Sequence, residues 1–357
     1  MHAAAELSRR DFLRLTAAGT ALAAASPTAA AQAPARKIRL GMDNFAVRAF
    51  GWKGRELVDY AAGLRLDTLF ITDLPALGTL EEAGAAELRR YAADKGVELL
   101  LGSWSICPTS RSFRKDWGTA EEHLALGLRL AKALGSPAFR VVLGNRDDRK
   151  SPGGIQARIA DTVKVLKSQE GLAKNLGVKV AMENHAGDMT ADELVGLIEA
   201  AGRDWVGANM DSGNAAWTLE DPLASLERLG PYALTTSLRD SAIWETDKGA
   251  KVQWTAMGEG GVVDLKQYFA RFAELCPQVA VNIETISGFA VEFPYLEPAF
   301  WEVFPDKRAA DFARFVALAR RGSATPQFDG TTRDRQQAEL ENSLRHCREV
   351  LGLGVRA

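Results

Sequence analysis

Residues 179–188 read KVAMENHAGD, and this stretch decides how the rest of the chain is interpreted. The short apolar run up to Met182 is typical of a buried β-strand, yet it ends in the polar side chains of Glu183 and His185. Strands that are buried on both faces belong to parallel sheets, and in closed barrels of such strands the functional groups lie at the carboxyl ends. The stretch therefore predicts a barrel strand that carries chemistry at its end.

On both sides of this strand, short β-rich runs alternate with longer segments of helical periodicity. Short β-rich runs predict strands at 38–42, 68–71, 97–101, 139–143, 178–182, 205–210, 232–236 and 279–283. Helical periodicity between them predicts helices at 54–62, 80–95, 119–134, 154–176, 191–201, 223–229, 265–275 and 307–320. Eight strand-helix units most simply close into an α/β fold of the (β/α)8 TIM barrel type, and an open doubly wound sheet is the alternative.

Three further expectations concern the boundaries of these units. Thr190 and Glu193 have the spacing of a capping box at the start of a helix, whereas the segment 154–176 is long enough to break. Residues 240–263, rich in Gly, Trp and charge, are expected to form a loop outside the repeat. The predicted domains are an export signal over 1–33, the barrel over 34–321 and a tail over 322–357 whose last half is helical.

The first residues have the pattern of an export signal. The segment SRRDFL, residues 8–13, places two arginines before an apolar stretch, and alanine-rich cleavage options follow near residue 31. This is the arrangement of a twin-arginine signal, so we expect passage through the twin-arginine export machinery and a periplasmic mature protein. Such export carries folded proteins, often with a cofactor already bound.

Composition excludes several classes of protein. The formal net charge is −2, and it is −3 without residues 1–33, which contain three arginines and two acidic residues. This balance favours neither nucleic acid nor an anionic membrane as a partner. Beyond the signal, no segment approaches the roughly 18 apolar residues of a membrane span. Three cysteines are too few for a disulfide framework, although one pair could form.

Acidic residues follow three of the predicted strands. Glu183, Asp211 and Glu284 each come directly after an apolar run, so we expect their side chains to meet in the barrel mouth. Converging buried carboxylates repel one another and need a cation, a shared proton or arginine partners. Their oxygen-rich chemistry favours Mg²⁺ or Mn²⁺.

An ordered set of motifs resembles a known family. MENHAGD, ANMDSGN, SLRD, MGEGGVVD and VNIET, in this order and spacing, are similar to the sugar phosphate isomerase/epimerase family, which has a xylose-isomerase-like TIM barrel. The resemblance covers most of residues 37–320. It implies a divalent metal held by Glu183, Asp211 and Glu284. It also implies that Glu183 and Glu284 are the acid/base groups on opposite sides of a sugar.

The sequence departs from the family at the fourth metal ligand. Where family members commonly show His-x-Lys-Asp after strand seven, this chain reads SLRD, with Ser237 in place of the histidine. Of the four histidines, only His185 is placed to reach the mouth. It could replace the ligand, bind substrate, act as an acid or base, or be a hydrogen-bonded loop residue. Two cofactor hypotheses remain: Mn²⁺ or Mg²⁺, or no metal at all because of Ser237.

Further candidates for substrate binding lie at other strand ends. Arg146 and Arg239 could stabilise an oxyanion or a substrate carboxylate, or could only neutralise neighbouring aspartates. Asn214, Ser237 and Trp104 complete the predicted set. Tryptophans in or near the carboxyl-side loops could stack on sugar rings or pack as lids; they are Trp104, Trp217, Trp244, Trp254 and Trp301.

We therefore expect a sugar-active enzyme of the isomerase or epimerase type. It would transfer a proton next to a carbonyl through a metal-stabilised enediolate on an unphosphorylated sugar or keto-glycoside. One alternative is a lyase that eliminates the aglycone from an oxidised sugar. Another is a non-catalytic carbohydrate-binding barrel that has lost its metal. An apurinic endonuclease of related fold is disfavoured, because it needs several histidines for zinc and a basic face for its substrate.

Overall fold

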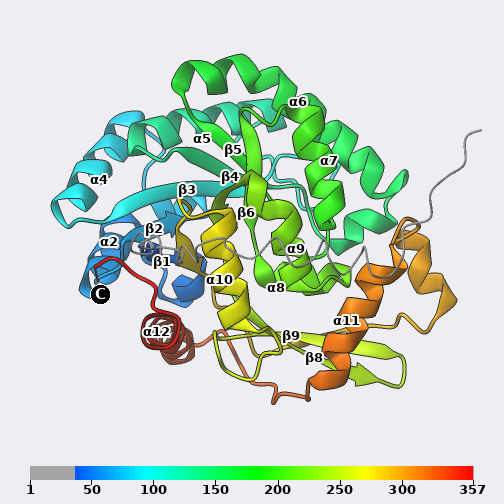
Figure 1. The fold of residues 1–357 in the computed structure, drawn as a ribbon. Coiled ribbons are helices and arrows are strands. Elements are labelled where there is room, and N and C mark those ends of the chain that lie inside the picture. Colours follow the sequence, from blue (N-terminus) through cyan, green and yellow to red (C-terminus); the bar gives the residue numbers. More distant parts are fainter. Residues whose placement is uncertain (1–36, 357) are drawn as a thin grey trace, which may run out of the picture. The chain divides into compact units, whose positions relative to one another are not determined.

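The described residues, 37–356, form a (β/α)8 barrel in the computed structural model, and the signal predicted at residues 1–33 lies outside this range (Figure 1). The barrel wall is a parallel eight-stranded sheet with the order β10-β1-β2-β3-β4-β5-β6-β7. Its strands are β1 (Leu40–Asp43), β2 (Thr68–Ile71), β3 (Glu98–Ser105), β4 (Ala138–Val142), β5 (Lys179–Glu183), β6 (Val206–Met210), β7 (Ala233–Thr236) and β10 (Val281–Ile283). Each overlaps a predicted strand, and the TIM barrel prediction is confirmed.

The barrel is closed just beyond the end of β7. Leu238 forms an isolated parallel bridge with Ile283 of β10. The amide of Leu238 donates to the carbonyl of Asn282 at 2.8 Å, and the amide of Glu284 donates to the carbonyl of Leu238 at 3.0 Å. This closure brings Arg239, the next residue in the chain, beside Glu284.

Helices of the predicted repeat surround the strands. They are α2 (Gly54–Gly63), α4 (Glu82–Asp94), α5 (Ala120–Leu134), α6 (Gly154–Leu176), α7 (Ala191–Ala201), α9 (Pro222–Leu229) and α10 (Leu265–Leu275). α6 runs unbroken for 23 residues, contrary to the expected break, because it packs along both α5 and α7. The predicted capping box starts α7: the amide of Glu193 donates to Oγ1 of Thr190 at 3.2 Å, and the amide of Thr190 donates to Oε2 of Glu193 at 2.8 Å.

Shorter helices connect these elements. They are α3 (Leu74–Leu77), α8 (Ser212–Ala215) and the 3₁₀ helices η1 (Asn44–Phe50), η2 (Arg146–Lys150), η3 (Ala216–Thr218), η4 (Gly230–Tyr232) and η5 (Pro298–Val303). Two of them, η2 and α8, begin directly after barrel strands β4 and β6. They lie on the carboxyl side of the barrel, where the polar strand ends are found.

Residues 240–263, expected to be a loop, contain a β-hairpin instead. β8 (Asp240–Thr246) pairs antiparallel with β9 (Gly249–Thr255), which pairs antiparallel with β11 (Ala290–Phe293). α11 (Ala309–Arg321), predicted as the helix that follows the eighth barrel strand, packs against β8 (Figure 1). The region is therefore a small second sheet rather than an irregular loop.

A separate hydrophobic core explains why this hairpin forms. Ile243 and Val252 of the hairpin pack with Phe293 of β11 and with Phe315 and Leu318 of α11. One face of each strand is therefore apolar, which is the pattern of a half-buried antiparallel strand. The many glycines and charges of this segment obscured that alternation in the sequence, and the partner residues lie far along the chain.

The tail contains α12 (Arg333–Glu349), which begins before the half of the segment that was predicted to be helical and ends within it. α12 packs against η1, β1 and β10. Its residues Leu340, Leu344 and Cys347 are buried in the main hydrophobic core. α12 therefore covers the barrel beside β1 and β10, whereas α11 covers the small sheet.

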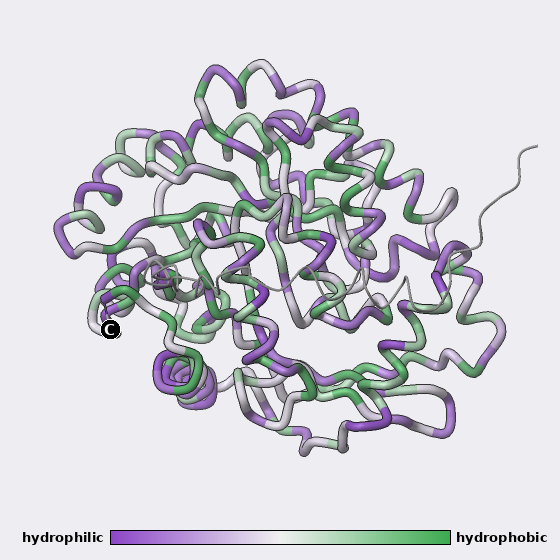
Figure 2. Tube along the Cα trace, in the orientation of Figure 1, coloured by the Kyte–Doolittle hydropathy of each residue, from purple (hydrophilic) through white to green (hydrophobic). Residues whose placement is uncertain are grey.

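Hydropathy follows this architecture. Figure 2 shows hydrophobic residues along the strands and hydrophilic residues on the outer turns of the surrounding helices. In the described part of the chain, no helix combines the length and the apolar character needed to span a bilayer. Cys107, Cys276 and Cys347 are buried and unpaired, so the pair that the sequence left open does not form here.

Candidate active site

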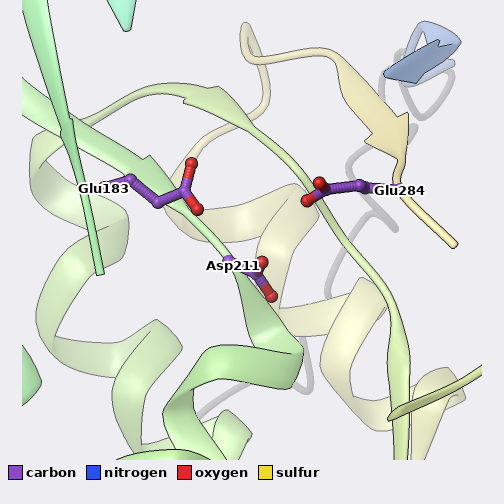
Figure 3. Close-up of side chains that lie close together, drawn as sticks. All are labelled: Glu183, Asp211 and Glu284. Atoms are coloured by element: carbon purple, nitrogen blue, oxygen red, sulfur yellow. The ribbon is translucent and has the colours of Figure 1, made fainter. Parts of the chain in front are cut away.

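Three acidic side chains from separate parts of the chain meet at the carboxyl end of the barrel. Glu183 is the last residue of β5, Asp211 follows β6 and Glu284 follows β10. One carboxylate oxygen of each lies within 4.8 Å of the other two. Figure 3 shows Glu183 and Glu284 pointing toward each other from opposite sides, with Asp211 near both. We refer to these three buried residues as the acidic triad.

The guanidinium of Arg239 bridges two members of the triad. Its Nη2 donates to Oδ2 of Asp211 and to Oε2 of Glu284. The sequence left Arg239 as a ligand of an oxyanion or substrate carboxylate or as a partner of Asp240; its carboxylate partners in the structure are Asp211 and Glu284, and its role toward substrate stays a prediction. Its Nε and Nη1 are buried and have no hydrogen-bond partner among the described residues. Two unpaired N–H groups of a buried guanidinium can donate to a ligand oxygen.

Arg140 of β4 pairs with the third carboxylate, and the sequence interpretation missed it. Its Nε donates to Oε2 of Glu183 at 2.5 Å, and its Nη1 donates to the carbonyl of Ser103 at 2.9 Å. Nδ2 of Asn209 donates to the same oxygen of Glu183 at 2.7 Å. A usable signal was present, because an arginine inside the otherwise apolar run 139–143 can be buried only beside an acidic partner.

A fourth buried carboxylate, that of Asp43 at the end of β1, was also missing from the predicted site. Its Oδ1 accepts from Oγ1 of Thr72 at 2.7 Å and from the amide of Phe45 at 2.9 Å. Its Oδ2 accepts from the hydroxyl of Ser237 at 3.0 Å. Ser237, which stands where the family resemblance implies a histidine ligand, therefore contacts Asp43 and forms no hydrogen bond with the triad.

The turn after β6 positions Asp211. Oδ1 of Asp211 accepts from the amides of Gly213 at 2.8 Å and Asn214 at 3.0 Å, and Oδ2 accepts from Nδ2 of Asn214 at 2.7 Å. The same Nδ2 lies 3.3 Å from Oε1 of Glu183. The side chain of Asn184 exchanges hydrogen bonds of 2.8 and 2.9 Å with the backbone of Asp211. Asn214, predicted to bind substrate, thus connects two carboxylates of the triad.

His185 lies at the mouth but outside the triad. Its Nδ1 is 2.6 Å from the carbonyl of Gly144, so we assign the proton to Nδ1 and leave Nε2 as an acceptor. Burial lowers the pKa of His185 and outweighs the attraction of Glu183, which keeps the ring neutral. Asp188 holds this turn by accepting from the amides of His185 at 2.9 Å and Gly144 at 3.1 Å.

A cavity of about 40 Å³ lies at the triad. Its polar wall contains Arg140, His185, Asn214, Arg239 and Glu284. A space of this size holds a few water molecules but not a sugar ring. Substrate therefore enters only if side chains at the mouth move.

Aromatic rings form the rest of the mouth. Trp104 lines the cavity, donates from Nε1 to Oδ1 of Asp73 at 2.9 Å and meets the ring of His185 edge-on, with centroids 6.4 Å apart. Trp254 also lines the cavity and stacks on Trp217, with centroids 4.3 Å apart. Trp104 and Trp254 thus line the cavity, whereas Trp217 contacts it only through its stacking on Trp254.

Other predicted residues lie further out. Arg146 is exposed, its guanidinium lies over the ring of Trp217 at 5.7 Å, and it forms no ion pair with a described residue. It is outside the triad and does not line the small cavity. Trp244 is on β8 and Trp301 is in η5, and neither lines that cavity. Arg146 comes after strand β4, whereas Arg140 lies within it. Of these two arginines, Arg140 is the one that contacts a carboxylate of the triad, that of Glu183.

The two glutamates of the triad have opposite electrostatic environments. Burial raises the pKa of Glu284 well above its ordinary value, and Arg239 offsets only part of that effect. For Glu183, burial acts in the same direction, but the charge and the hydrogen bond of Arg140 outweigh it and hold its pKa below the ordinary value. Burial also raises the pKa of Asp211 to about 6, against the attraction of Arg239. The opposite directions of these two pKa shifts suit Glu183 to the role of base and Glu284 to the role of acid.

By chemistry and spacing, the triad could hold a divalent cation, because clustered buried carboxylates are typical ligands of Mg²⁺ and Mn²⁺. Two contacts oppose a resident metal. The guanidinium of Arg239 already fills the position between Asp211 and Glu284. Ser237 supplies a hydroxyl where a histidine ligand is implied, and that hydroxyl is bonded to Asp43. The side chains as arranged therefore do not fit a metal that binds both Asp211 and Glu284.

Comparisons with known proteins agree with the fold. A model of the xylose isomerase-like TIM barrel family matches residues 46–304. One similar solved structure is D-psicose 3-epimerase in the presence of D-fructose, with a TM-score of 0.59, 16% identity and coverage of 88% of this chain and 100% of that chain. Another is D-psicose 3-epimerase with D-tagatose from Clostridium cellulolyticum H10, with a TM-score of 0.56, 14% identity and coverage of 88% and 99%.

A third similar structure is the IOLI protein with a binding zinc atom, with a TM-score of 0.55, 15% identity and coverage of 81% of this chain and 100% of that chain. Identities of this size establish a likeness of fold. The sequence matches none of the curated proteins with which it was compared.

Proposed function

Since this chain belongs to the xylose isomerase-like TIM barrel family, we propose that it is a sugar isomerase or epimerase that moves a proton next to a carbonyl group. One observation carries the proposal: Glu183 and Glu284 face each other across a buried site, with the guanidinium of Arg239 beside them. Two carboxyl groups on opposite sides of one carbon can remove a proton from one face and return it to the other.

The environments of the two glutamates assign their roles. Glu183 receives hydrogen bonds from Arg140 and Asn209, which favour its ionised form, so it takes the proton from the carbon next to the carbonyl. Electron density then moves onto the carbonyl oxygen and gives an enediolate. Glu284, whose pKa burial raises, returns a proton to the other face or to the neighbouring carbon. The first outcome is epimerisation. The second is isomerisation, in which the hydroxyl proton of the first carbon also moves to the former carbonyl oxygen.

Arg239 is suited to stabilise the oxygen that becomes negative. Its Nε and Nη1 are buried without a partner, and the residue lines the small cavity. Preorganised donors in a site that excludes water stabilise a developing oxyanion strongly. We therefore assign to Arg239, rather than to Mn²⁺ or Mg²⁺, the positive charge that enediolate chemistry requires.

An unphosphorylated sugar or keto-glycoside is the proposed substrate. Arg140 and Arg239, the cationic side chains that line the cavity, are both paired with carboxylates. Their positive charges are therefore already balanced, and the cavity has no surplus positive charge to offset the dianionic charge of a phosphate group. A sugar with neutral hydroxyls fits this balance better than a sugar phosphate.

The test is exchange of carbon-bound hydrogen in D₂O. Purified protein would be incubated with D-fructose, D-psicose, D-tagatose and a 3-keto-glucoside, and deuterium incorporation would be followed by NMR. We expect Glu183→Gln and Glu284→Gln each to lower the exchange rate by about 100-fold or more. Glu245→Gln, at an exposed position of β8, is the control and should leave the rate unchanged. Unchanged exchange in either triad variant would contradict the assigned roles.

Metal analysis tests whether Arg239 or a divalent metal supplies the positive charge that stabilises the enediolate. We expect protein purified without chelators to contain no stoichiometric divalent metal and to keep its exchange activity after dialysis against EDTA. One equivalent of bound Mn²⁺ or Mg²⁺, together with loss of activity on chelation, would show that a metal and not Arg239 performs this role.

A non-catalytic sugar-binding barrel is the second candidate. Ser237 in place of the expected histidine favours it, because a barrel that lost its metal could keep only its binding function. Binding of a sugar without any deuterium exchange would support this candidate. A lyase would instead release the aglycone from a keto-glycoside after the same proton removal by Glu183, and the released product would identify it.

Export to the periplasm is part of the proposal and rests on the sequence of residues 8–13, SRRDFL. Replacing both arginines by lysine should retain the precursor in the cytoplasm if the twin-arginine machinery transports it. The measurement is immunoblotting of periplasmic and cytoplasmic fractions. An unchanged distribution would contradict this route.

A further inference from the structure

A second and larger cavity adjoins the triad cavity. It measures about 380 Å³ and is bounded by β9, by the segment 325–328 and by α12. This volume is within the range of small-molecule sites, roughly 300–1,000 Å³. We call it the outer chamber. The wall residues that matter for its chemistry are Gln253, Trp254, Thr255, Thr325, Arg335 and Glu339.

Several buried polar atoms in the wall of the outer chamber lack partners. Oε1 of Gln253, Nε1 of Trp254 and Oγ1 of Thr255 are inaccessible to solvent and make no hydrogen bond with described residues. Gln253 is 1% exposed and Thr255 is 6% exposed. An unsatisfied buried polar atom destabilises the fold, so the presence of several around one cavity points to a ligand that satisfies them.

Two charged groups of the same wall neutralise each other. Arg335 pairs with Glu339 at 2.9 Å, and Glu339 also accepts from the hydroxyl of Ser287. Glu259, which is exposed, accepts from Nδ2 of Asn342 at 3.0 Å. The buried part of the wall formed by Gln253 and Thr255 therefore offers neutral donors and acceptors. This pattern matches a ligand with hydroxyl groups and no net charge.

Trp254 connects the two cavities. It lines both of them, and the guanidinium of Arg239 lies over its ring at 4.4 Å. Successive residues of a strand point to opposite faces, so Gln253 and Thr255 share one face of β9, and Trp254 between them packs toward Trp217. Trp254 is thus a common wall of the outer chamber and of the triad cavity, which Glu284 also lines.

We propose that the outer chamber binds the second ring of a disaccharide or glycoside whose first ring reacts at the triad. The inference rests on the proposed function, because it assigns the substrate class of that site. The neutral second ring would pair its hydroxyls with Gln253 and Thr255, and the glycosidic link would pass the edge of Trp254. A free monosaccharide leaves the outer chamber empty.

Calorimetric titration tests this assignment independently of turnover. The probes are maltose, cellobiose and trehalose, compared with glucose, on the full mature chain. We expect at least one disaccharide to bind about tenfold more tightly than glucose, which corresponds to roughly 1.4 kcal/mol. Equal affinities for glucose and all three disaccharides, or no binding at all, would overturn the proposal.

Two variants test whether Thr255 and Gln253 of the outer chamber bind the second sugar ring. Thr255→Val is nearly isosteric and removes a hydroxyl that has no partner, so the fold should tolerate it. We expect it to weaken disaccharide binding about tenfold and to leave glucose binding unchanged. Thr246→Val, on β8 and outside the chamber, is the matched control. Gln253→Met is the second variant, with the same expectation, and circular dichroism verifies the fold of each.

The outcomes separate the two proposals. A disaccharide preference that depends on Thr255, without deuterium exchange on any keto sugar, supports the outer chamber and overturns the enzyme. Exchange that is insensitive to Thr255→Val and Gln253→Met, with no preference for disaccharides, supports the enzyme and overturns the outer chamber.

Discussion

Gly213 lies directly against the side chain of Arg239: a Cβ atom at residue 213 would be 2.4 Å from Cγ of the arginine. The glycine of the DSGN motif therefore provides the space through which Arg239 reaches Asp211 and Glu284. The two residues follow neighbouring strands, β6 and β7, and the parallel pairing of these strands brings them together.

Gly213→Ala should displace Arg239 from the triad. The added methyl group cannot fit beside Cγ, and such overpacking typically costs about 1–3 kcal/mol. We expect a lower free energy of unfolding in urea and a lower rate of deuterium exchange. Gly196→Ala is the matched control, because a Cβ there meets no atom within 4 Å in the exposed face of α7, and it should be neutral or slightly stabilising. Equal behaviour of the two variants would disprove the role of Gly213.

Arg239→Met should leave Asp211 and Glu284 without their shared cation. Removing one partner of a buried ion pair costs about 3–5 kcal/mol, which urea denaturation would measure. The emptied position should also admit a divalent ion between the carboxylates. We therefore expect Mn²⁺ to raise the melting temperature of Arg239→Met and not that of the wild type. An equal rise in both proteins would show that Arg239 does not exclude the metal.

The pair formed by Arg140 and Glu183 should behave as one buried unit. Arg140→Met alone should destabilise the protein by about 3–5 kcal/mol, because it leaves Glu183 buried and uncompensated. The double variant Arg140→Met/Glu183→Met should recover much of this loss. The exposed pair of Arg203 and Glu199 is the comparison, with an expected coupling of about 0.5 kcal/mol or less. A double-mutant cycle with no recovery would contradict the pairing.

Stability should decrease as pH rises toward 8. Burial raises the pKa of Asp188 from its ordinary value of 3.8 to about 8, so the folded state holds this proton more tightly than the unfolded chain. The resulting contribution is complete below about pH 4 and is lost progressively up to about pH 8. Asp188→Asn cannot ionise and should show a smaller decrease in the free energy of unfolding between pH 5 and 8. Asp247→Asn, in the exposed hairpin turn, should retain the full slope.

The free energy of unfolding of Asp188→Asn should still decrease somewhat between pH 5 and 8, because burial also raises the pKa of Asp240 to about 7. Identical slopes for Asp188→Asn and the wild type would show that Asp188 is not protonated in the folded state. The same variant should loosen the turn of His185, since an amide cannot accept from both the Gly144 and His185 backbone amides.

The barrel could be predicted because the pattern of each of its strands and helices is contained in a short stretch of sequence. Each strand and helix carries its own periodicity, and an acidic residue directly after an apolar run, such as Glu183 or Asp211, is placed by the fold at the carboxyl rim. The small sheet could not be predicted in the same way. Ile243 and Val252 are buried only because Phe293 and Phe315, distant in sequence, pack against them.

The amino-acid sequence by itself determined the α/β class, the order of the strands and the convergence of Glu183, Asp211 and Glu284, since these follow from periodicity and from the positions of polar residues at strand ends. Only the tertiary structure decided how these carboxylates are neutralised. Arg140 and Arg239 reach them across neighbouring strands, and burial then sets which carboxyl groups hold protons. Pairing and desolvation depend on distances between side chains that are remote in the chain, and those distances exist only once the barrel has closed.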